Sequence, residues 1–166
     1  VKEEGISYFE LSQVEMTDAY IDQVLEASIN HGITVMATSV NYQPLFQNAK
    51  GLDLERDFEK IIRFNHKLGV RYIRDSLIPK SCIHNEEGYY KAAETLNQYG
   101  RLLDAEDLHL YYHNHHFEFE RFGDKTGFEI LVEQTDPQYV GFEPDVHWIQ
   151  RAGHDPVNWI KKLSGR

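Results

Sequence analysis

The chain alternates between short apolar segments and longer amphipathic ones, and this alternation limits its possible folds more than any other feature. Apolar, β-branched or aromatic residues predict strands at 6–11, 33–40, 70–78 and 108–113, and a further strand begins near Val140. The segments between these strands place apolar residues at helical spacing. A chain of strand–helix units forms a parallel sheet with right-handed crossovers. We therefore predict an α/β fold.

Helix start and stop signals support the same reading. Thr17 and Asp53 are predicted N-caps, and Gly32 and Gly69 are predicted to end the two helices that follow them. A helix is predicted over 86–104, with Tyr90 on its buried face, and another over 127–134. Proline after Asp155 is typical of the first position of a last helix.

Two architectures fit this pattern. A five-stranded doubly wound sheet would be complete at this length, whereas a (β/α)₈ TIM barrel needs about 250 residues. No glycine-rich phosphate loop follows the first strand, and both ends of the sequence read as helix tails. We therefore predict one domain over 1–166, an incomplete TIM barrel lacking the first strand and the last two strands.

Composition narrows the functional classes. The net charge of −10 disfavours nucleic-acid binding, which needs a basic surface. The sequence has no apolar run long enough to cross a membrane, no signal peptide and a single cysteine, Cys82. These features predict a cytoplasmic enzyme without a membrane or nucleic-acid partner, and they allow a homo-oligomer.

The residues 108–119 (Leu-His-Leu-Tyr-Tyr-His-Asn-His-His-Phe-Glu-Phe) begin as a strand and end in imidazole and carboxylate groups. In parallel α/β folds the functional site lies at the carboxyl ends of the strands. His113, His115 and Glu118 are therefore candidate site residues, as is Glu10 at the end of the first predicted strand. Asp75 and His109 are expected to be ordinary solvated residues, and the same holds for His116 and His154.

A second polar segment follows about thirty residues later. Glu143, Asp145 and His147 occupy alternate positions, and on a strand their side chains would project from the same face. Two inward-facing acids on a buried strand are costly unless they are paired or bind a cation. Mixed imidazole and carboxylate ligands suit Mn²⁺, Zn²⁺, Co²⁺ or Mg²⁺. His147 and Trp148 could line a substrate pocket.

Three segments resemble the sugar phosphate isomerase/epimerase family of xylose-isomerase-like TIM barrels. They are 113–119 (His-Asn-His-His-Phe-Glu-Phe), 141–148 (Gly-Phe-Glu-Pro-Asp-Val-His-Trp) and 152–159 (Ala-Gly-His-Asp-Pro-Val-Asn-Trp). The resemblance implies a barrel with one divalent metal, held by carboxylates and a histidine from its last four strands. It also implies a sugar or sugar derivative as substrate.

The resemblance assigns roles residue by residue. Asp145 matches the metal ligand of the sixth barrel strand, whereas the fifth-strand ligand is either His113 or Glu118. Glu118 is slightly preferred because a carboxylate there could also act as base, and the two predicted catalytic residues are Glu118 and Glu143. The remaining ligands, a histidine and a glutamate, are expected beyond Arg166. The predicted substrate-binding residues are Glu10, His115, His147 and Trp148.

The implied reaction is proton abstraction next to a carbonyl, through an enediolate, in an isomerase or epimerase. The same groups would also serve a dehydratase or lyase acting on an inosose or a 3-keto-glycoside. Metal-assisted phosphodiester hydrolysis, as in endonuclease IV, is disfavoured by the acidic charge. A non-catalytic sugar-binding relative is a further alternative.

Overall fold

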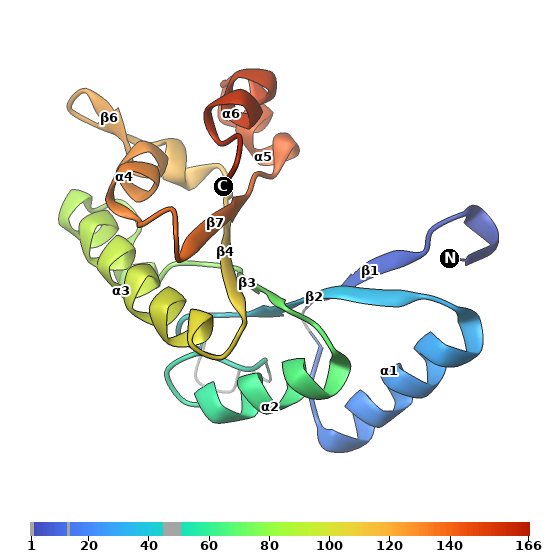
Figure 1. Ribbon diagram of the computed structural model, residues 1–166. Coiled ribbons are helices and arrows are strands. Elements are labelled where there is room, and N and C mark those ends of the chain that lie inside the picture. The colour runs from blue at the N-terminus through green and yellow to red at the C-terminus, as the bar shows by residue number, and fades with distance from the viewer. Residues whose placement is uncertain (1, 13, 45–50) are drawn as a thin grey trace.

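The computed structural model describes residues 2–12, 14–44 and 51–166, and its main feature is a curved parallel sheet (Figure 1). The sheet order is β1-β2-β3-β4-β7, so each strand lies next to its predecessor in the chain. A doubly wound sheet would reverse its strand order part of the way along. The sequential order therefore confirms the incomplete barrel and excludes the alternative. The strands are β1 (Tyr8–Leu11), β2 (Thr34–Val40), β3 (Tyr72–Asp75), β4 (His109–His113) and β7 (Val140–Glu143).

Helices connect these strands and line the outer side of the sheet, as Figure 1 shows for α1, α2 and α3. A short antiparallel hairpin, β5 (Arg121–Phe122) with β6 (Lys125–Thr126), precedes α4. No helix in the described part of the chain is long and apolar enough to cross a membrane. The helices are α1 (Asp18–His31), α2 (Phe58–Leu68), α3 (Glu86–Asp104), α4 (Gly127–Gln134), α5 (Val146–Arg151) and α6 (Pro156–Lys162); the 3₁₀ turns are η1 (Lys2–Glu4), η2 (Lys80–Cys82) and η3 (Phe117–Phe119).

Most of the predicted helix boundaries are confirmed. Thr17 accepts a hydrogen bond from the Tyr20 backbone N–H as N-cap of α1, and Gly32 and Gly69 end α1 and α2 in the left-handed conformation. The prediction for Asp53 was wrong. Asp53 accepts hydrogen bonds from the backbone and side chain of Arg56 in a turn, and α2 begins five residues later at Phe58.

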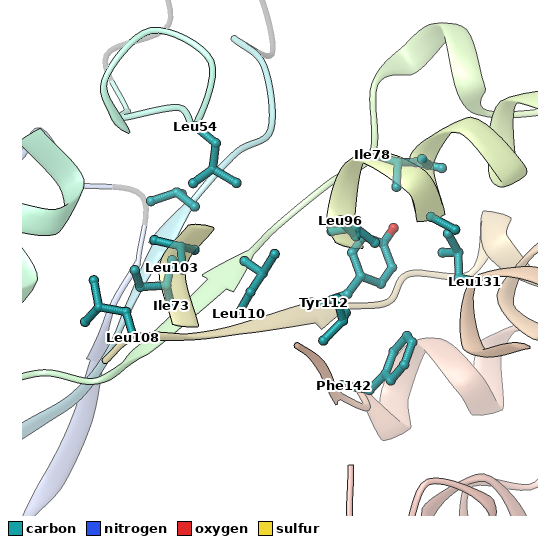
Figure 2. Packing of buried hydrophobic residues seen from close by; sticks show 14 of the residues in the cluster. Leu54, Ile73, Ile78, Leu96, Leu103, Leu108, Leu110, Tyr112, Leu131 and Phe142 are labelled. Carbon is teal, nitrogen blue, oxygen red and sulfur yellow. The ribbon is translucent and has the colours of Figure 1, made fainter. Parts of the chain in front are cut away.

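The hydrophobic core lies between the sheet and the helices around it, and Figure 2 shows part of this core. Leu110 and Tyr112 alternate with interior-facing residues along β4, so both point to the helices, where Leu96 and Leu103 of α3 pack against the sheet. The prediction of Tyr90 as a core residue was wrong, because its neighbour Tyr89 is fully buried and Tyr90 is exposed.

The inner face of the sheet is open. Tyr8, Met36 and Tyr72 point into it and remain 60, 47 and 41% exposed, which is unusual for large apolar side chains. Together with the inner residues of β4 and β7 they line a groove of about 470 Å³. In a closed barrel such side chains form a packed interior. One part of this groove is apolar, and polar residues at the carboxyl ends of the strands line the other part.

Close backbone contact between α3 and the start of β7 makes Gly100 a test of this packing. A Cβ atom at Gly100 would lie 2.6 Å from the carbonyl oxygen of Tyr139. Gly100→Ala should therefore lower the free energy of unfolding by about 1–3 kcal/mol, although alanine is the better helix former. Urea denaturation measures the change. Gln98→Ala, on the exposed side of α3, should change stability by less than about 0.5 kcal/mol. A Gly100→Ala protein as stable as the wild type would contradict this arrangement of α3.

Candidate functional site

Three charged side chains from three strands meet at the carboxyl end of the sheet. Nε of Arg74 on β3 lies 2.7 Å from Oε1 of Glu10 on β1 and 3.9 Å from Oε1 of Glu143 on β7. Nη2 of Arg74 also donates a hydrogen bond to the Ser12 hydroxyl at 2.6 Å. Arg74 is nearly buried, so its charge is poorly solvated and needs these anionic partners. This ion-pair cluster is the first part of the candidate site.

Glu143 is the most accessible member of the cluster. Its side chain is 45% exposed, against 23% for Glu10. Partial burial and the negative charge of Glu10 raise the pKa of Glu143 above its ordinary value, while the charge of Arg74 opposes the shift. A raised pKa makes Glu143 a better proton acceptor than an ordinary glutamate, and its exposure makes it accessible.

A histidine and an aspartate form the second part of the site. Nε2 of His113, at the end of β4, lies 3.1 Å from Oδ2 of Asp145. Partial burial lowers the pKa of His113 despite its hydrogen bond to Asp145, so the ring is neutral near pH 7. Burial alone would raise the pKa of Asp145, but hydrogen bonds from the Trp148 backbone and from His113 hold that pKa below its ordinary value. Neutral imidazole and ionised carboxylate are the forms that bind metals.

The predicted extended conformation of 143–147 was wrong. β7 ends at Glu143, and Pro144 separates it from Asp145, which is the N-cap of α5. Oδ1 of Asp145 accepts hydrogen bonds from the backbone N–H groups of His147 and Trp148. Capping satisfies these otherwise unpaired donors, and it turns the chain into a helix at the residue where alternation was expected to continue. His147 is consequently an exposed helical residue.

Aromatic rings form a wall beside the His113–Asp145 pair. His115 lies 4.9 Å from the His113 ring and 5.6 Å from the Trp148 ring, measured between centroids. His116 stacks on Trp148 at 5.3 Å and His147 contacts it at 4.9 Å. The wall thus brings together three of the predicted substrate-binding residues, and Glu10 lies in the ion-pair cluster. His116 is exposed as predicted, whereas His154 is half-buried against another ring, that of Phe119.

Glu118 occupies a different environment from the other candidate acids. Its side chain is fully buried, and Oε1 accepts a hydrogen bond from the Tyr112 hydroxyl at 2.6 Å. Oε2 accepts another from the His115 backbone N–H at 2.8 Å. Tyr112 points to the helix side of β4, whereas His113 faces the interior. These contacts tie Glu118 to the outer side of the strand.

Asp75 was predicted to be a solvated strand end, and this prediction was wrong. Asp75 lies on the outer face of β3, in register with Tyr112, and is only 1% exposed. Its Oδ2 atom has no hydrogen-bond partner among the residues that the structure describes, and burial raises its pKa to about 7. The alternation of strand residues explains the difference, because Arg74 takes the interior position next to it. His109 was also expected to be solvated but is half-buried.

Two site residues escaped the sequence reasoning. Arg74 interrupts an otherwise apolar strand, and this signal could have marked it as a charge with partners in the site. Asn114, between two histidines, is fully buried and accepts a hydrogen bond from the Asp145 backbone. No spacing rule distinguishes such an asparagine from a loop residue.

The described residues form no group of three or more histidine, cysteine, aspartate or glutamate side chains that could hold a metal ion. They supply instead one imidazole and one carboxylate, His113 and Asp145, at adjacent strand ends. The chemistry of this pair suits a divalent metal, and a full coordination shell would need further ligands.

The comparisons with known structures identify the fold. The chain superimposes on a sugar phosphate isomerase/epimerase from Parabacteroides distasonis ATCC 8503 with a TM-score of 0.81 at 22% identity, covering 99% of this chain and 67% of that one. For the 3-keto-D-glucoside 4-epimerase of E. coli the TM-score is 0.68 at 14% identity, with 98 and 66% coverage. The chain therefore has the fold of the xylose-isomerase-like TIM barrels, which confirms the fold implied by the resemblance of its motifs.

The chain is also similar in sequence to two curated proteins. The chain is 28% identical over 131 residues to an inosose dehydratase of Bacillus cereus (strain AH820), covering 68% of this chain and 43% of that protein. It is 31% identical over 92 residues to inosose dehydratase 2 from another strain of Bacillus cereus, covering 54 and 30%. The chain spans less than half the length of these curated relatives. No protein-family model matches it.

The burial of Asp75 predicts an unusual dependence of stability on pH. Its pKa of about 7 in the folded protein exceeds the ordinary value of 3.8, so the folded state binds more protons between these two values. Ionisation of Asp75 therefore does not lower the free energy of unfolding below about pH 4. The loss grows as the pH rises, to at most about 4 kcal/mol above pH 7. Asp75→Asn removes this loss.

The stabilising effect of Asp75→Asn should consequently be larger at about pH 8 than at about pH 4.5, by about 2–4 kcal/mol. Urea denaturation at the two pH values measures it. Asp124→Asn, at an exposed position, should have little effect at either pH. An Asp75→Asn effect that is equal at both values would show that Asp75 does not titrate as its burial implies.

Proposed function

We propose that this chain contributes part of the active site of a divalent-metal-dependent enzyme that moves a proton next to a carbonyl group in a sugar or cyclic polyol ketone. The observation that carries the proposal is that two sets of side chains lie together at the carboxyl end of the sheet. These are the Arg74–Glu10–Glu143 cluster, with an accessible carboxylate of raised pKa, and the His113–Asp145 pair. Together they offer a base and metal ligands side by side.

His113 and Asp145 are the proposed metal ligands from this chain. Their facing Nε2 and Oδ2 atoms support this assignment, since both belong to groups that bind Mn²⁺, Zn²⁺, Co²⁺ or Mg²⁺. For the fifth barrel strand the geometry supports His113 over Glu118, whose two oxygens accept hydrogen bonds from Tyr112 and His115. A metal bound there would act as a Lewis acid on the substrate carbonyl.

Glu143 is the proposed base. It would take the proton from the carbon next to the carbonyl, and Arg74 beside it would keep the site from accumulating uncompensated negative charge. The Trp148 wall would pack against the apolar face of a sugar ring, and His115 would offer a hydrogen-bonding nitrogen to a hydroxyl group. Glu118 would then support the site rather than react.

The fate of the carbanion decides the reaction class. Return of the proton to the opposite face of the same carbon gives an epimerase, and delivery to the neighbouring carbon gives an isomerase; several structural neighbours carry these names. Loss of a hydroxyl from the next carbon gives a dehydratase. The sequence similarity to two inosose dehydratases favours this second candidate and suggests inososes as the first substrates to test.

Metal binding by the full-length protein tests the ligand assignment. Asp145→Asn and His113→Ala should each weaken Mn²⁺ binding by more than about 100-fold, because each removes a direct ligand, whereas Glu118→Gln should cost less. Isothermal calorimetry measures the affinities, and circular dichroism checks the fold of each variant. If Glu118→Gln releases the metal and His113→Ala does not, the fifth-strand ligand is Glu118.

The role of Glu143 is tested by the step that all candidate reactions share. Glu143→Gln should slow deuterium uptake from solvent at the carbon next to the carbonyl by about 10²- to 10⁴-fold, with Mn²⁺ affinity retained. Nuclear magnetic resonance of inososes, 3-keto-glucosides and ketoses in D₂O measures the uptake. Glu94→Gln, at an exposed site on α3, should behave as wild type. Uptake at the wild-type rate in Glu143→Gln would exclude Glu143 as the base.

A further inference from the structure

Asn114 lies between the candidate metal ligand His113 and the wall residue His115, and its side chain is fully buried. A buried amide is costly unless its oxygen and nitrogen find partners. Its Oδ1 accepts a hydrogen bond from the backbone N–H of Asp145 at 2.9 Å, and its Nδ2 donates to the His115 carbonyl at 3.3 Å. We infer that Asn114 is a positioning residue that directs the carboxylate of Asp145 toward His113.

The hydrogen bonds of Asp145 explain how this positioning works. Oδ1 is fixed by the backbone N–H groups of His147 and Trp148 at the start of α5. The backbone N–H of Asp145 is fixed by Asn114, so both the main chain and one carboxylate oxygen are held. Oδ2 is the remaining oxygen, and it faces Nε2 of His113. The direction of Oδ2 therefore depends on the main-chain anchor that Asn114 provides.

The link matters because it joins two segments that are far apart in the chain. Asn114 directly follows β4, and Asp145 is the N-cap of α5, 31 residues later. Backbone pairing between β4 and β7 ends at His113 and Glu143, so the ladder does not reach Asp145. Asparagine suits the position because one side chain supplies both an acceptor for Asp145 and a donor for its own segment.

The inference rests on the proposed function insofar as Asp145 binds a metal. Groups that orient metal ligands commonly change metal affinity by about 10- to 100-fold when they are removed. Loss of the Asn114 anchor should therefore weaken metal binding without removing any ligand. It should also expose the Asp145 amide to exchange with solvent, and this second effect does not require a metal.

Isosteric substitutions in the full-length protein separate positioning from packing. Asn114→Leu keeps the branched shape of the side chain and removes both hydrogen bonds, whereas Asn114→Asp keeps the acceptor for the Asp145 N–H. Asn65→Leu is a matched control on α2. Asn65 is also fully buried, with Oδ1 accepting from the Thr38 hydroxyl and Nδ2 donating to the Ile61 carbonyl, each at 2.9 Å. Mn²⁺ affinity, melting temperature and amide exchange at Asp145 are measured for each protein.

Asn114→Leu should bind Mn²⁺ about 10- to 100-fold more weakly, while Asn65→Leu loses comparable melting temperature and keeps its affinity. Asn114→Asp, even if Asn114→Leu fails to fold, should stay within about tenfold of wild type. Wild-type affinity in folded Asn114→Leu, an equal loss in Asn65→Leu, or a larger loss in Asn114→Asp would overturn the inference.

Amide exchange distinguishes failure of this inference from failure of the proposed function. In the metal-free wild type the Asp145 amide should be protected, and Asn114→Leu should exchange it at least about tenfold faster while Asn65→Leu does not. A wild type that binds no Mn²⁺ but shows this pattern would reject the metal site and retain the positioning role. An unprotected Asp145 amide in the wild type would overturn the positioning role itself.

Discussion

The ion pairs of Arg74 depend on the curvature of the sheet, and the site depends on those ion pairs. β1 and β7 are the two edges of the sheet, and each is two strands away from β3. In a flat sheet these edges would lie about 10 Å to either side of Arg74. Only a sheet that curls toward a barrel lets one guanidinium approach carboxylates from both edges. The charge cluster is thus a direct chemical consequence of barrel geometry.

Strand alternation then sorts the polar residues into two functional environments. Arg74 and His113 face the interior, whereas their chain neighbours Asp75 and Tyr112 face the helices. The result is an inner layer that is partly open to solvent and charged, and an outer layer whose acids are fully buried. Glu118 joins the outer layer through the hydroxyl of Tyr112. Acidic residues that all lie near strand ends in the sequence therefore differ in whether a substrate can contact them.

This division into two environments explains which structural features could be predicted from the sequence. The order of strands and helices was predictable because hydrophobic periodicity and glycine stops are local signals, as in α1, α2 and α3. The direction of individual side chains at strand ends was not predictable, because a shift of one residue along a strand moves a side chain to the opposite face of the sheet. Asp75 was taken for a solvated residue, and the alternation expected through His147 gave way to an N-cap at Asp145. The partners of Arg74, and Asp145 as the partner of Asn114, lie far away in the sequence, where periodicity carries no information.

The conformation at Asp145 shows why a metal-binding residue can also be a structural one. A carboxylate that caps a helix has one oxygen held by backbone N–H groups, so the entropy lost on binding a ligand through the other oxygen is small. The same hydrogen bonds hold the pKa of Asp145 low, which keeps the carboxylate ionised when no cation is present. Helix capping therefore prepares both the direction and the charge of Oδ2. The nearby His113 is neutral for the opposite reason, since burial disfavours its protonated form. An ionised acid beside a neutral imidazole leaves a net negative charge at this edge of the sheet, which a divalent cation would balance.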